Sequence, residues 1–284
     1  MIDVHAHINL ENFPLETNNA EKKKAFHDIL SAAKSANISR IVSVSENIYD
    51  VQHIFDLAAQ SDGLIKPAVG LHPVQRLDVN DTRERSVTLS DLEHFEPVLK
   101  EAIANKKICC VGEIGLDYSR HIVTTNQYND GLSEDESRNE QRQVFRRQVE
   151  LAMAADLPVN VHSRSAGHHA LEILYECRAT RVVMHAFDGR PAHAKKAVEA
   201  GYYFSVPPSI VRSPHFQKVV AALPLSSLLL ESDSPALGPE KGVDNEPANI
   251  TLAAQEIARI KDIQVEEVVK QTTANARTLF GPAI

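Results

Sequence analysis

The chain has 284 residues, 43% of them hydrophobic and 24% charged, which is an ordinary balance for a globular protein. Its formal net charge of −8, with no basic stripe, argues against a protein that grips a long DNA duplex through many phosphates. No apolar run approaches the roughly 20 residues of a membrane-spanning helix. An expected strand at Ile2 leaves no space for a signal peptide, so we expect an intracellular protein, cytoplasmic or nuclear, without a membrane partner.

Short aliphatic or β-branched runs alternate with helical patterns along the chain, which predicts βα units around a parallel sheet. The expected strands are Ile2–His7, Arg40–Ser45, Ile65–Leu71, Ile108–Glu113, Pro158–His162, Arg181–His185, Tyr202–Val206 and Ser227–Glu231. The expected helices are Glu21–Ala36, Val51–Gln60, Leu89–Asn105, Ser137–Asp156, Ala166–Cys177, Ala192–Ala200, Pro214–Ala222, Asn249–Ile260 and Val265–Phe280. This pattern predicts an α/β fold, a (β/α)8 TIM barrel of the metal-dependent hydrolase type, with residues 1–284 forming one domain.

Two long polar stretches follow expected strands, Tyr118–Glu136 and Ser234–Pro247. Barrel enzymes carry their active sites at the C-terminal ends of their strands, so each stretch is a candidate for covering a substrate. The alternative, an ordinary solvated loop, is equally compatible with the composition.

Metal-binding side chains recur where the expected strands end. Residues i and i+2 of a strand share a face, so His5 and His7 point together into the barrel mouth. Imidazole suits zinc and manganese, and carboxylate suits magnesium and manganese. Apolar strands seldom end in such residues by chance, so we expect one metal site. Its six expected ligands, from five strands, are His5, His7, Glu113, His162, His185 and Asp233.

Six ligands are more than a single catalytic zinc ion usually takes from a protein. Two divalent ions (Zn, Mg or Mn) about 3.5–4 Å apart and bridged by a carboxylate fit better. We expect Glu113 to be the bridge, and we expect the glycines on either side, Gly112 and Gly115, to let backbone approach a ligand closely. The expected division gives one ion His5, His7 and Asp233, and the other ion His162 and His185.

Six segments, taken in order, resemble the TatD-type metal-dependent deoxyribonucleases of the amidohydrolase-like barrel superfamily. They are Asp3–His7, Gly70–Pro73, Gly112–Tyr118, Val161–Arg164, His185–Gly189 and Glu231–Pro235. The resemblance implies metal-dependent DNA hydrolysis, in which His72 and Arg164 approach the scissile phosphate. Ser165, Asp244 and Ala186 depart from the usual family residues, and they change the pocket rim without removing a metal ligand.

The working hypothesis is attack on phosphorus by a metal-activated water, with Asp233 as proton acceptor and Glu113 as the shared ligand. Arg164 suits bidentate phosphate binding, and His72 would donate to the phosphate or to the leaving oxygen. The expected substrate is DNA, at strand ends or in single strands, or a small phosphodiester. Two alternatives stay open: a binuclear hydrolase of a small phosphoester, amide or lactone, and a non-enzymatic metal-retaining scaffold. The sequence leaves the oligomeric state open.

Overall fold

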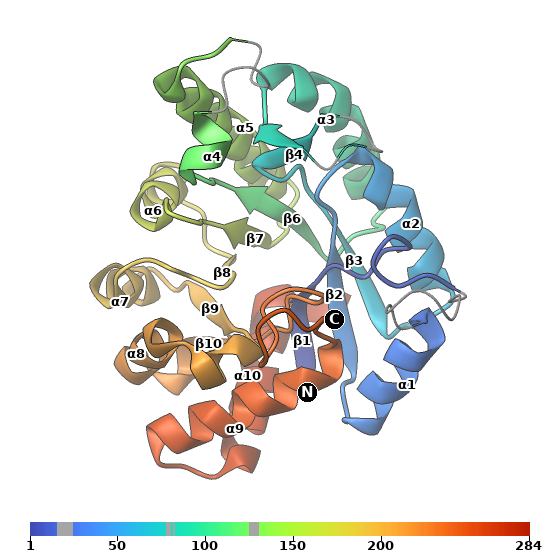
Figure 1. The fold of residues 1–284 in the computed structure, drawn as a ribbon, viewed down its shortest axis with the longest axis vertical. Coiled ribbons are helices and arrows are strands. Elements are labelled where there is room, and N and C mark those ends of the chain that lie inside the picture. The colour runs from blue at the N-terminus through green and yellow to red at the C-terminus, as the bar shows by residue number, and fades with distance from the viewer. Residues whose placement is uncertain (16–24, 78–80, 82, 125–130) are drawn as a thin grey trace.

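Eight parallel strands close into a barrel in the computed structural model, which describes residues 1–15, 25–77, 81, 83–124 and 131–284 (Figure 1). Around the barrel the strands follow the order β1, β10, β9, β8, β7, β6, β3 and β2. Their bounds are β1 Ile2–Ala6, β2 Arg40–Val44, β3 Ile65–Val69, β6 Cys110–Gly115, β7 Val159–His162, β8 Val182–Met184, β9 Tyr203–Val206 and β10 Leu228–Leu230. The expected barrel is confirmed, and each expected strand end lies within two residues of the observed one.

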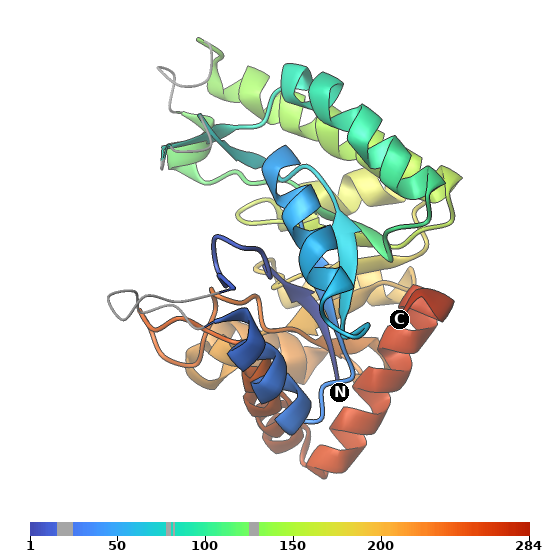
Figure 2. The same ribbon diagram turned by 90° about the vertical axis from the view of Figure 1, so that its right-hand side faces the viewer.

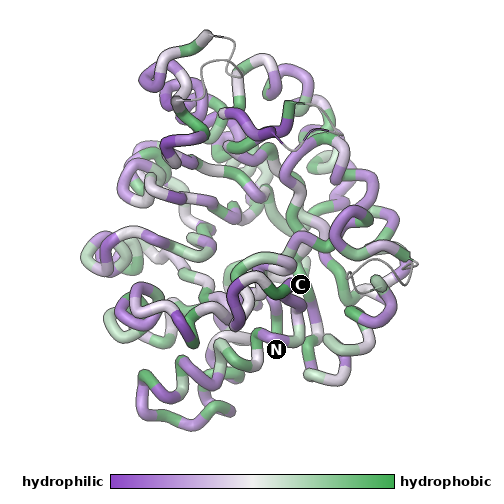
Figure 3. Tube along the Cα trace, viewed as in Figure 1, coloured by the Kyte–Doolittle hydropathy of each residue, from purple (hydrophilic) through white to green (hydrophobic). Residues whose placement is uncertain are grey.

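Helices surround the barrel, and Figure 3 shows hydrophobic and hydrophilic residues interspersed along them, as in helices with one buried face. Their bounds are α1 Phe26–Ser35, α2 Ile48–Ala59, α3 Leu89–Ala104, α4 Arg120–Val123, α5 Glu134–Ala154, α6 Gly167–Glu176, α7 Pro191–Glu199, α8 Pro214–Ala222, α9 Ile250–Lys261 and α10 Val265–Phe280. Short 3-10 helices cover Pro208–Arg212, Leu225–Ser227, Pro247–Asn249 and Gly281–Ala283. Within the described residues, no helix is long and apolar enough to cross a membrane.

Two helices begin three residues earlier than expected because of their caps. The Asn47 side chain accepts hydrogen bonds from the backbone N–H groups of Tyr49 and Asp50, and α2 therefore begins at Ile48. Ser133 forms a capping box with Glu136, which starts α5 at Glu134. The first expected helix begins at Phe26, and residues 21–24 of that expectation lie outside the described residues.

One small element was not expected from the sequence. The antiparallel strands β4, Val74–Arg76, and β5, Glu84–Ser86, form a separate two-stranded sheet. The polar stretch Tyr118–Glu136 contains the short helix α4, and its residues 125–130 lie outside the described part of the chain. Figure 2 shows the β4–β5 sheet, α4 and the loop after β10 on one side of the molecule, with both termini toward the other side.

Alternate residues of the strands enter two apolar clusters. Val182 and Met184 join the main cluster with the helices, whereas Val183 between them joins a smaller cluster. The smaller cluster also contains Leu229 and Phe280, so the end of α10 packs against it. This alternation is what a barrel with a packed interior requires, and it leaves the polar positions to gather at the C-terminal strand ends.

Candidate metal centre

Four donor atoms meet where β1, β6 and β10 end. We call them the first donor group: His5 Nε2, His7 Nε2, Glu113 Oε2 and Asp233 Oδ1. Five of their six pairwise distances are 3.2–3.5 Å. A tetrahedral site with metal–ligand bonds of about 2.0–2.1 Å separates its ligand atoms by roughly 3.4 Å. The first donor group therefore has the dimensions of a cage around one small cation.

The other oxygen of the same carboxylate faces a second set of nitrogens. His162 Nδ1 lies 2.8 Å from Glu113 Oε1, and His72 Nε2 and His185 Nε2 each lie 3.5 Å from it. These four atoms are the second donor group. The structure thus brings the six expected ligands together and adds His72, which the resemblance placed near the phosphate.

A buried atom without a partner supports the presence of a cation. Glu113 is 1% exposed, and its Oε2 makes no hydrogen bond within the described part of the chain. A desolvated carboxylate oxygen without a partner is costly, whereas one that ligates a cation is satisfied. The donor set of imidazoles and carboxylates fits a divalent metal ion.

Hydrogen bonds on the outer side fix the ring of His5. Its Nδ1 lies 2.9 Å from Asn160 Oδ1, and Asn160 Nδ2 donates to the Val4 carbonyl at 2.8 Å. The second bond fixes the orientation of the amide, so His5 Nδ1 must be the donor to Oδ1. Nε2 then carries the lone pair that faces the first donor group.

Buried carboxylates fix the rings of two histidines in the second donor group by contacts on their outer side. Asp117 Oδ2 lies 3.1 Å from His162 Nε2, which leaves Nδ1 to face Glu113. Glu231 Oε2 lies 3.0 Å from His185 Nδ1, which leaves Nε2 to face inward. Glu231 also accepts from Ser205 Oγ at 2.5 Å and from the Ala186 N–H at 3.0 Å, so both its oxygens are engaged. Glu231 therefore orients a ligand and is not itself placed to hold an ion.

Opposite charges shift the pKa values across the centre. Burial alone would lower the pKa of His7, but Glu46, Asp233 and Glu113 raise it to about 10. Burial also opposes charge on His162, yet Asp117 and Glu113 raise its pKa to about 9. Burial would raise the pKa values of the two carboxylates, but the surrounding histidines hold the pKa of Glu113 and that of Asp233 well below the ordinary range. In the metal-free protein His7 and His162 therefore hold protons, which a bound cation must displace.

Irregular strand pairing accompanies two of the donors. The register between β1 and β2 shifts between Asp3 and Ala6, a stretch that contains His5. The register between β6 and β7 shifts between Val111 and Ile114, a stretch that contains Glu113. Bulges re-aim side chains and occur next to active sites.

The glycines beside Glu113 allow two neighbouring strands to approach closely. A Cβ on Gly112 would lie 2.6 Å from the Asn160 Cβ, and one on Gly115 would lie 2.0 Å from the His162 carbonyl oxygen. Gly115 also has a φ of +150°, which favours glycine. These glycines thus allow β6 and β7 to approach closely, and the two strands must adjoin for Glu113 to face His162.

Asp233 is held by the pairing that closes the barrel. Its backbone has a φ of 56°, a left-handed conformation that aspartate adopts more readily than most residues. The Asp233 N–H donates to the His5 carbonyl at 2.9 Å, and the His7 N–H donates to the Ser234 carbonyl at 2.8 Å. These two bonds join the end of β10 to the end of β1 and so assemble the first donor group.

A hollow of about 480 Å³ opens above the centre. Within its lining, the acidic residues are Glu46, Glu84, Glu113, Asp117 and Asp233, and the arginines are Arg76 and Arg164. Arg164 is exposed, and it also lines an adjoining smaller hollow. Because carboxylates outnumber arginines in this lining, cations bound at the centre would make the hollow more favourable for an anion.

Three residues that position the ligands were missed by the sequence interpretation: Asn160, Asp117 and Glu231. Each lies in a segment already singled out for another residue. Asn160 stands two residues before His162, and Glu231 two before Asp233, a spacing that places side chains on one strand face. This two-residue spacing could have identified Asn160 and Glu231 from the sequence. Asp117 lies beyond the end of its strand, and no such spacing pointed to it.

The fold and the site together define a class, the barrel hydrolases that depend on divalent metal ions. Residues 2–281 match the family model described as TatD related DNase. The chain therefore belongs to the TatD-related DNase family, as the six sequence segments indicated.

Individual relatives agree with this assignment. Deoxyribonuclease TATDN3 of Homo sapiens is 44% identical over 280 residues, which are 99% of this chain and 94% of the human protein. The uncharacterized metal-dependent hydrolase YabD of Bacillus subtilis is 29% identical, over 99% of this chain and 98% of its own. The crystal structure of YJJV, a TatD homologue from Escherichia coli, has a TM-score of 0.76 at 25% identity, over 99% of this chain and 97% of its own. The sequence stretches 162–167, 185–191 and 234–241 resemble the third human TatD-domain-containing protein, and the 44% identity over 99% of the chain confirms that resemblance.

Proposed function

We propose that this protein hydrolyses phosphodiester bonds in DNA, at strand ends or in single strands, with two divalent ions. The observation that carries the proposal is the buried Glu113, whose two oxygens face two separate donor groups. Two ions about 3.5–4 Å apart are used by phosphatases and nucleases to stabilise the attacking and leaving oxygens. The name of the human relative, a deoxyribonuclease, supports DNA as the substrate.

The proposed ligand assignment follows the two donor groups. One ion would be held by His5, His7 and Asp233, and the other by His162 and His185, with Glu113 contributing an oxygen to each. His72 Nε2, the remaining atom of the second donor group, would contact either the ion held there or the substrate. When bound, the ions would supply Lewis acidity, which neutralises phosphate charge and lowers the pKa of water.

The side chains divide the remaining work by position. Asp233, whose side chain is 9% exposed, opens into the hollow and is placed to accept a proton from water there. Arg164 at the rim presents a planar guanidinium for two phosphate oxygens. Asn160, Asp117 and Glu231 keep the histidine lone pairs aimed inward, so little reorganisation is needed when substrate enters.

The charge distribution favours a small nucleic-acid footprint. With a net charge of −8 and a mostly acidic hollow, the protein offers few contacts for a long duplex. Phosphate binding would therefore be concentrated at the cations and Arg164. A strand end or a single strand presents one phosphate to such a site more readily than the middle of a duplex does.

Related barrels that hydrolyse amides or lactones commonly bridge their metals with a carboxylated lysine on the fourth strand. Glu113 stands at that place here, on β6, the fourth strand of the barrel along the chain. This feature favours phosphodiester chemistry over the amide and lactone alternatives.

The test compares wild type with Asp233→Asn, each with Mg²⁺, Mn²⁺ or Zn²⁺, on labelled single- and double-stranded DNA, RNA and a small phosphodiester. We expect wild type to cleave single-stranded DNA and the variant to be slower by about 10²–10⁴-fold, the usual contribution of a general base. No cleavage by wild type with any metal would refute the nuclease. Equal cleavage by both proteins would show that Asp233 is not the proton acceptor or that the preparation contains another nuclease.

A further inference from the structure

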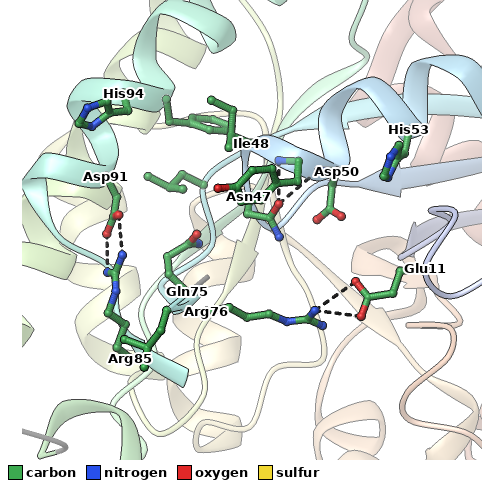
Figure 4. A pocket seen from close by; sticks show the side chains of 14 residues that line it. Glu11, Asn47, Ile48, Asp50, His53, Gln75, Arg76, Arg85, Asp91 and His94 are labelled. Atoms are coloured by element: carbon green, nitrogen blue, oxygen red, sulfur yellow. Dashed lines mark hydrogen bonds and ion pairs between the residues drawn. The ribbon is translucent and has the colours of Figure 1, made fainter. Parts of the chain in front are cut away.

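A second hollow, the side pocket, lies beside the metal hollow between the start of α2, the first half of α3 and the β4–β5 sheet (Figure 4). Its volume is about 480 Å³, within the range of about 300–1,000 Å³ found for small-molecule sites. Asn47, Gln75 and Arg76 line both hollows, so the two spaces adjoin. A ligand held at the metal centre can therefore extend into the side pocket.

The charged groups of the side pocket are paired with one another. Arg76 Nη1 lies 2.9 Å from Glu11 Oε1, and Arg85 makes two bonds of 2.6 and 2.7 Å to Asp91 (Figure 4). Asp50 accepts hydrogen bonds from Asn9 Nδ2 and from the Glu46 N–H. Because both arginines are neutralised by carboxylates, the side pocket is not built for a phosphate. It suits a neutral group.

The rest of the lining is apolar and aromatic. Leu71, Leu77 and Phe95 line it, together with Ile48 and Tyr49 in the first turn of α2. Ile48 is 40% exposed and Tyr49 is 56% exposed, an unusual extent for large apolar side chains placed next to each other. The cap from Asn47 holds this turn in place. A preorganised aromatic surface with histidine and amide groups nearby is suited to a flat ring that has polar edges.

We propose that the side pocket binds a nucleobase of the DNA strand whose phosphate lies at the metal centre, with the base stacked against Tyr49 and Ile48. The inference rests on the proposed function and extends it, because it adds recognition of the nucleoside to recognition of the phosphate. Stacking on aromatic side chains tolerates every base, since each base has a π-face. The side pocket therefore distinguishes nucleotides from simple phosphodiesters without selecting a sequence.

The first test uses substrates that differ only in the base-bearing group. The 4-nitrophenyl esters of thymidine 5′-phosphate and thymidine 3′-phosphate carry a base on one side or the other, and methyl 4-nitrophenyl phosphate carries none. For Tyr49→Ala we expect KM to rise about tenfold for at least one thymidine ester, with kcat within about twofold of wild type. For the methyl ester, KM and kcat of Tyr49→Ala should both stay within about twofold of the wild-type values.

Met153→Ala is the matched control. Met153 is 40% exposed and lines neither the metal hollow nor the side pocket, so all three substrates should be cleaved as by wild type. Unchanged KM values of Tyr49→Ala for both thymidine esters would overturn the base pocket. An equal loss on the methyl ester would also overturn it, because Tyr49 would then act through the metal centre.

A binding measurement separates this inference from the proposed function. The fluorescent nucleotide 2-aminopurine deoxyriboside 5′-monophosphate is quenched when its base stacks, and the measurement requires no hydrolysis. We expect saturable quenching by wild type and about tenfold weaker binding by Tyr49→Ala and by Ile48→Ser. Quenching without any DNA cleavage would support the side pocket and refute the nuclease, whereas DNA cleavage without quenching would refute the side pocket alone.

Discussion

The two donor groups around Glu113 differ in how they would bind a cation. The first donor group has four atoms at nearly tetrahedral spacing, and its His5 is backed by a neutral amide, that of Asn160. In the second donor group, His162 and His185 are instead backed by the buried carboxylates of Asp117 and Glu231. A carboxylate behind an imidazole raises its basicity as a ligand. The first group thus depends on geometry, and the second on the polarisation of its histidines.

This contrast predicts that the two donor groups differ in how tightly they hold an ion. A cage in which the protein supplies all four ligands is typical of a tightly held ion. The second donor group has three proposed ligands, Glu113, His162 and His185, and its fourth atom, His72 Nε2, is free to contact the substrate. We therefore expect the ion in the first donor group to remain bound and the ion in the second donor group to exchange more readily. The predictions below test this difference.

The largest effect is expected from Glu113→Gln, because this residue serves both donor groups. An amide offers one oxygen in place of two and carries no charge, so both sites lose affinity together. Metal bound per chain, measured by mass spectrometry of the dialysed protein, should fall at both sites, and DNA cleavage should fall by at least about 10³-fold. Retention of two ions by Glu113→Gln would show that the carboxylate is not shared.

Metal affinity should rise steeply with pH, and the two donor groups should differ in the pH above which their affinity stays constant. A raised pKa means that the imidazole is protonated at pH 7 and that its proton competes with the cation. Affinity should therefore rise with pH, about tenfold per unit for one displaced proton. The affinity of the second donor group should level off near pH 9, because the pKa of His162 is about 9. The affinity of the first donor group should level off near pH 10, because the pKa of His7 is about 10.

Calorimetric titration of the metal-free protein in buffers of different ionisation enthalpy measures the protons released. Proton release should decrease as the pH rises, since fewer imidazoles remain protonated. Affinity that is constant from pH 7 to 9 would contradict the raised pKa values.

Removal of an outer carboxylate should weaken the second donor group selectively. Asp117→Asn and Glu231→Gln keep the shape of the side chain but lose its charge, and such changes commonly cost about 10–100-fold in metal affinity. Binding of one ion per chain should weaken by this factor while the other ion stays bound. If both ions weakened equally, the two groups would not be independent in the way that their separate partners indicate.

The smallest effect on metal affinity is expected from a substitution of Asn160, which lies behind His5. Asn160→Ala removes an orienting amide without removing a charge, so affinity at the first donor group should fall only several-fold. Thermal unfolding of the metal-free variant serves as the control, because Asn160 also donates to the Val4 carbonyl. A loss in affinity larger than that of Asp117→Asn would reverse the proposed contrast between geometry and polarisation.

The barrel and the convergence of the six expected side chains could be predicted because both depend on local patterns. Aliphatic runs buried on both faces predict parallel strands, and imidazoles or carboxylates at strand ends predict convergence at one rim. The location of Glu113 between the two donor groups also followed from its place between the two pairs of histidines along the chain. Asn160 and Glu231 could have been found by the same two-residue spacing that identified His5 and His7.

Other features depend on contacts between distant segments. The strands β4 and β5 contain three residues each, too few for a recognisable alternation, and they form only by pairing with each other. The side pocket requires α2, α3 and this small sheet to be placed together. The role of Gly112 and Gly115 depends on how closely β7 passes, which no local pattern reveals.

The bonds that join the end of β10 to the end of β1 have a consequence during biosynthesis. His5 and Asp233 stand near opposite ends of the chain, whereas the second donor group is drawn from residues 72 to 185. At about 5–20 residues per second, a ribosome needs roughly 10–45 s to proceed from His5 to Asp233. The first donor group is therefore incomplete for most of translation, and it can assemble only after β10, the last barrel strand to be synthesised, and Asp233 beyond it have been made.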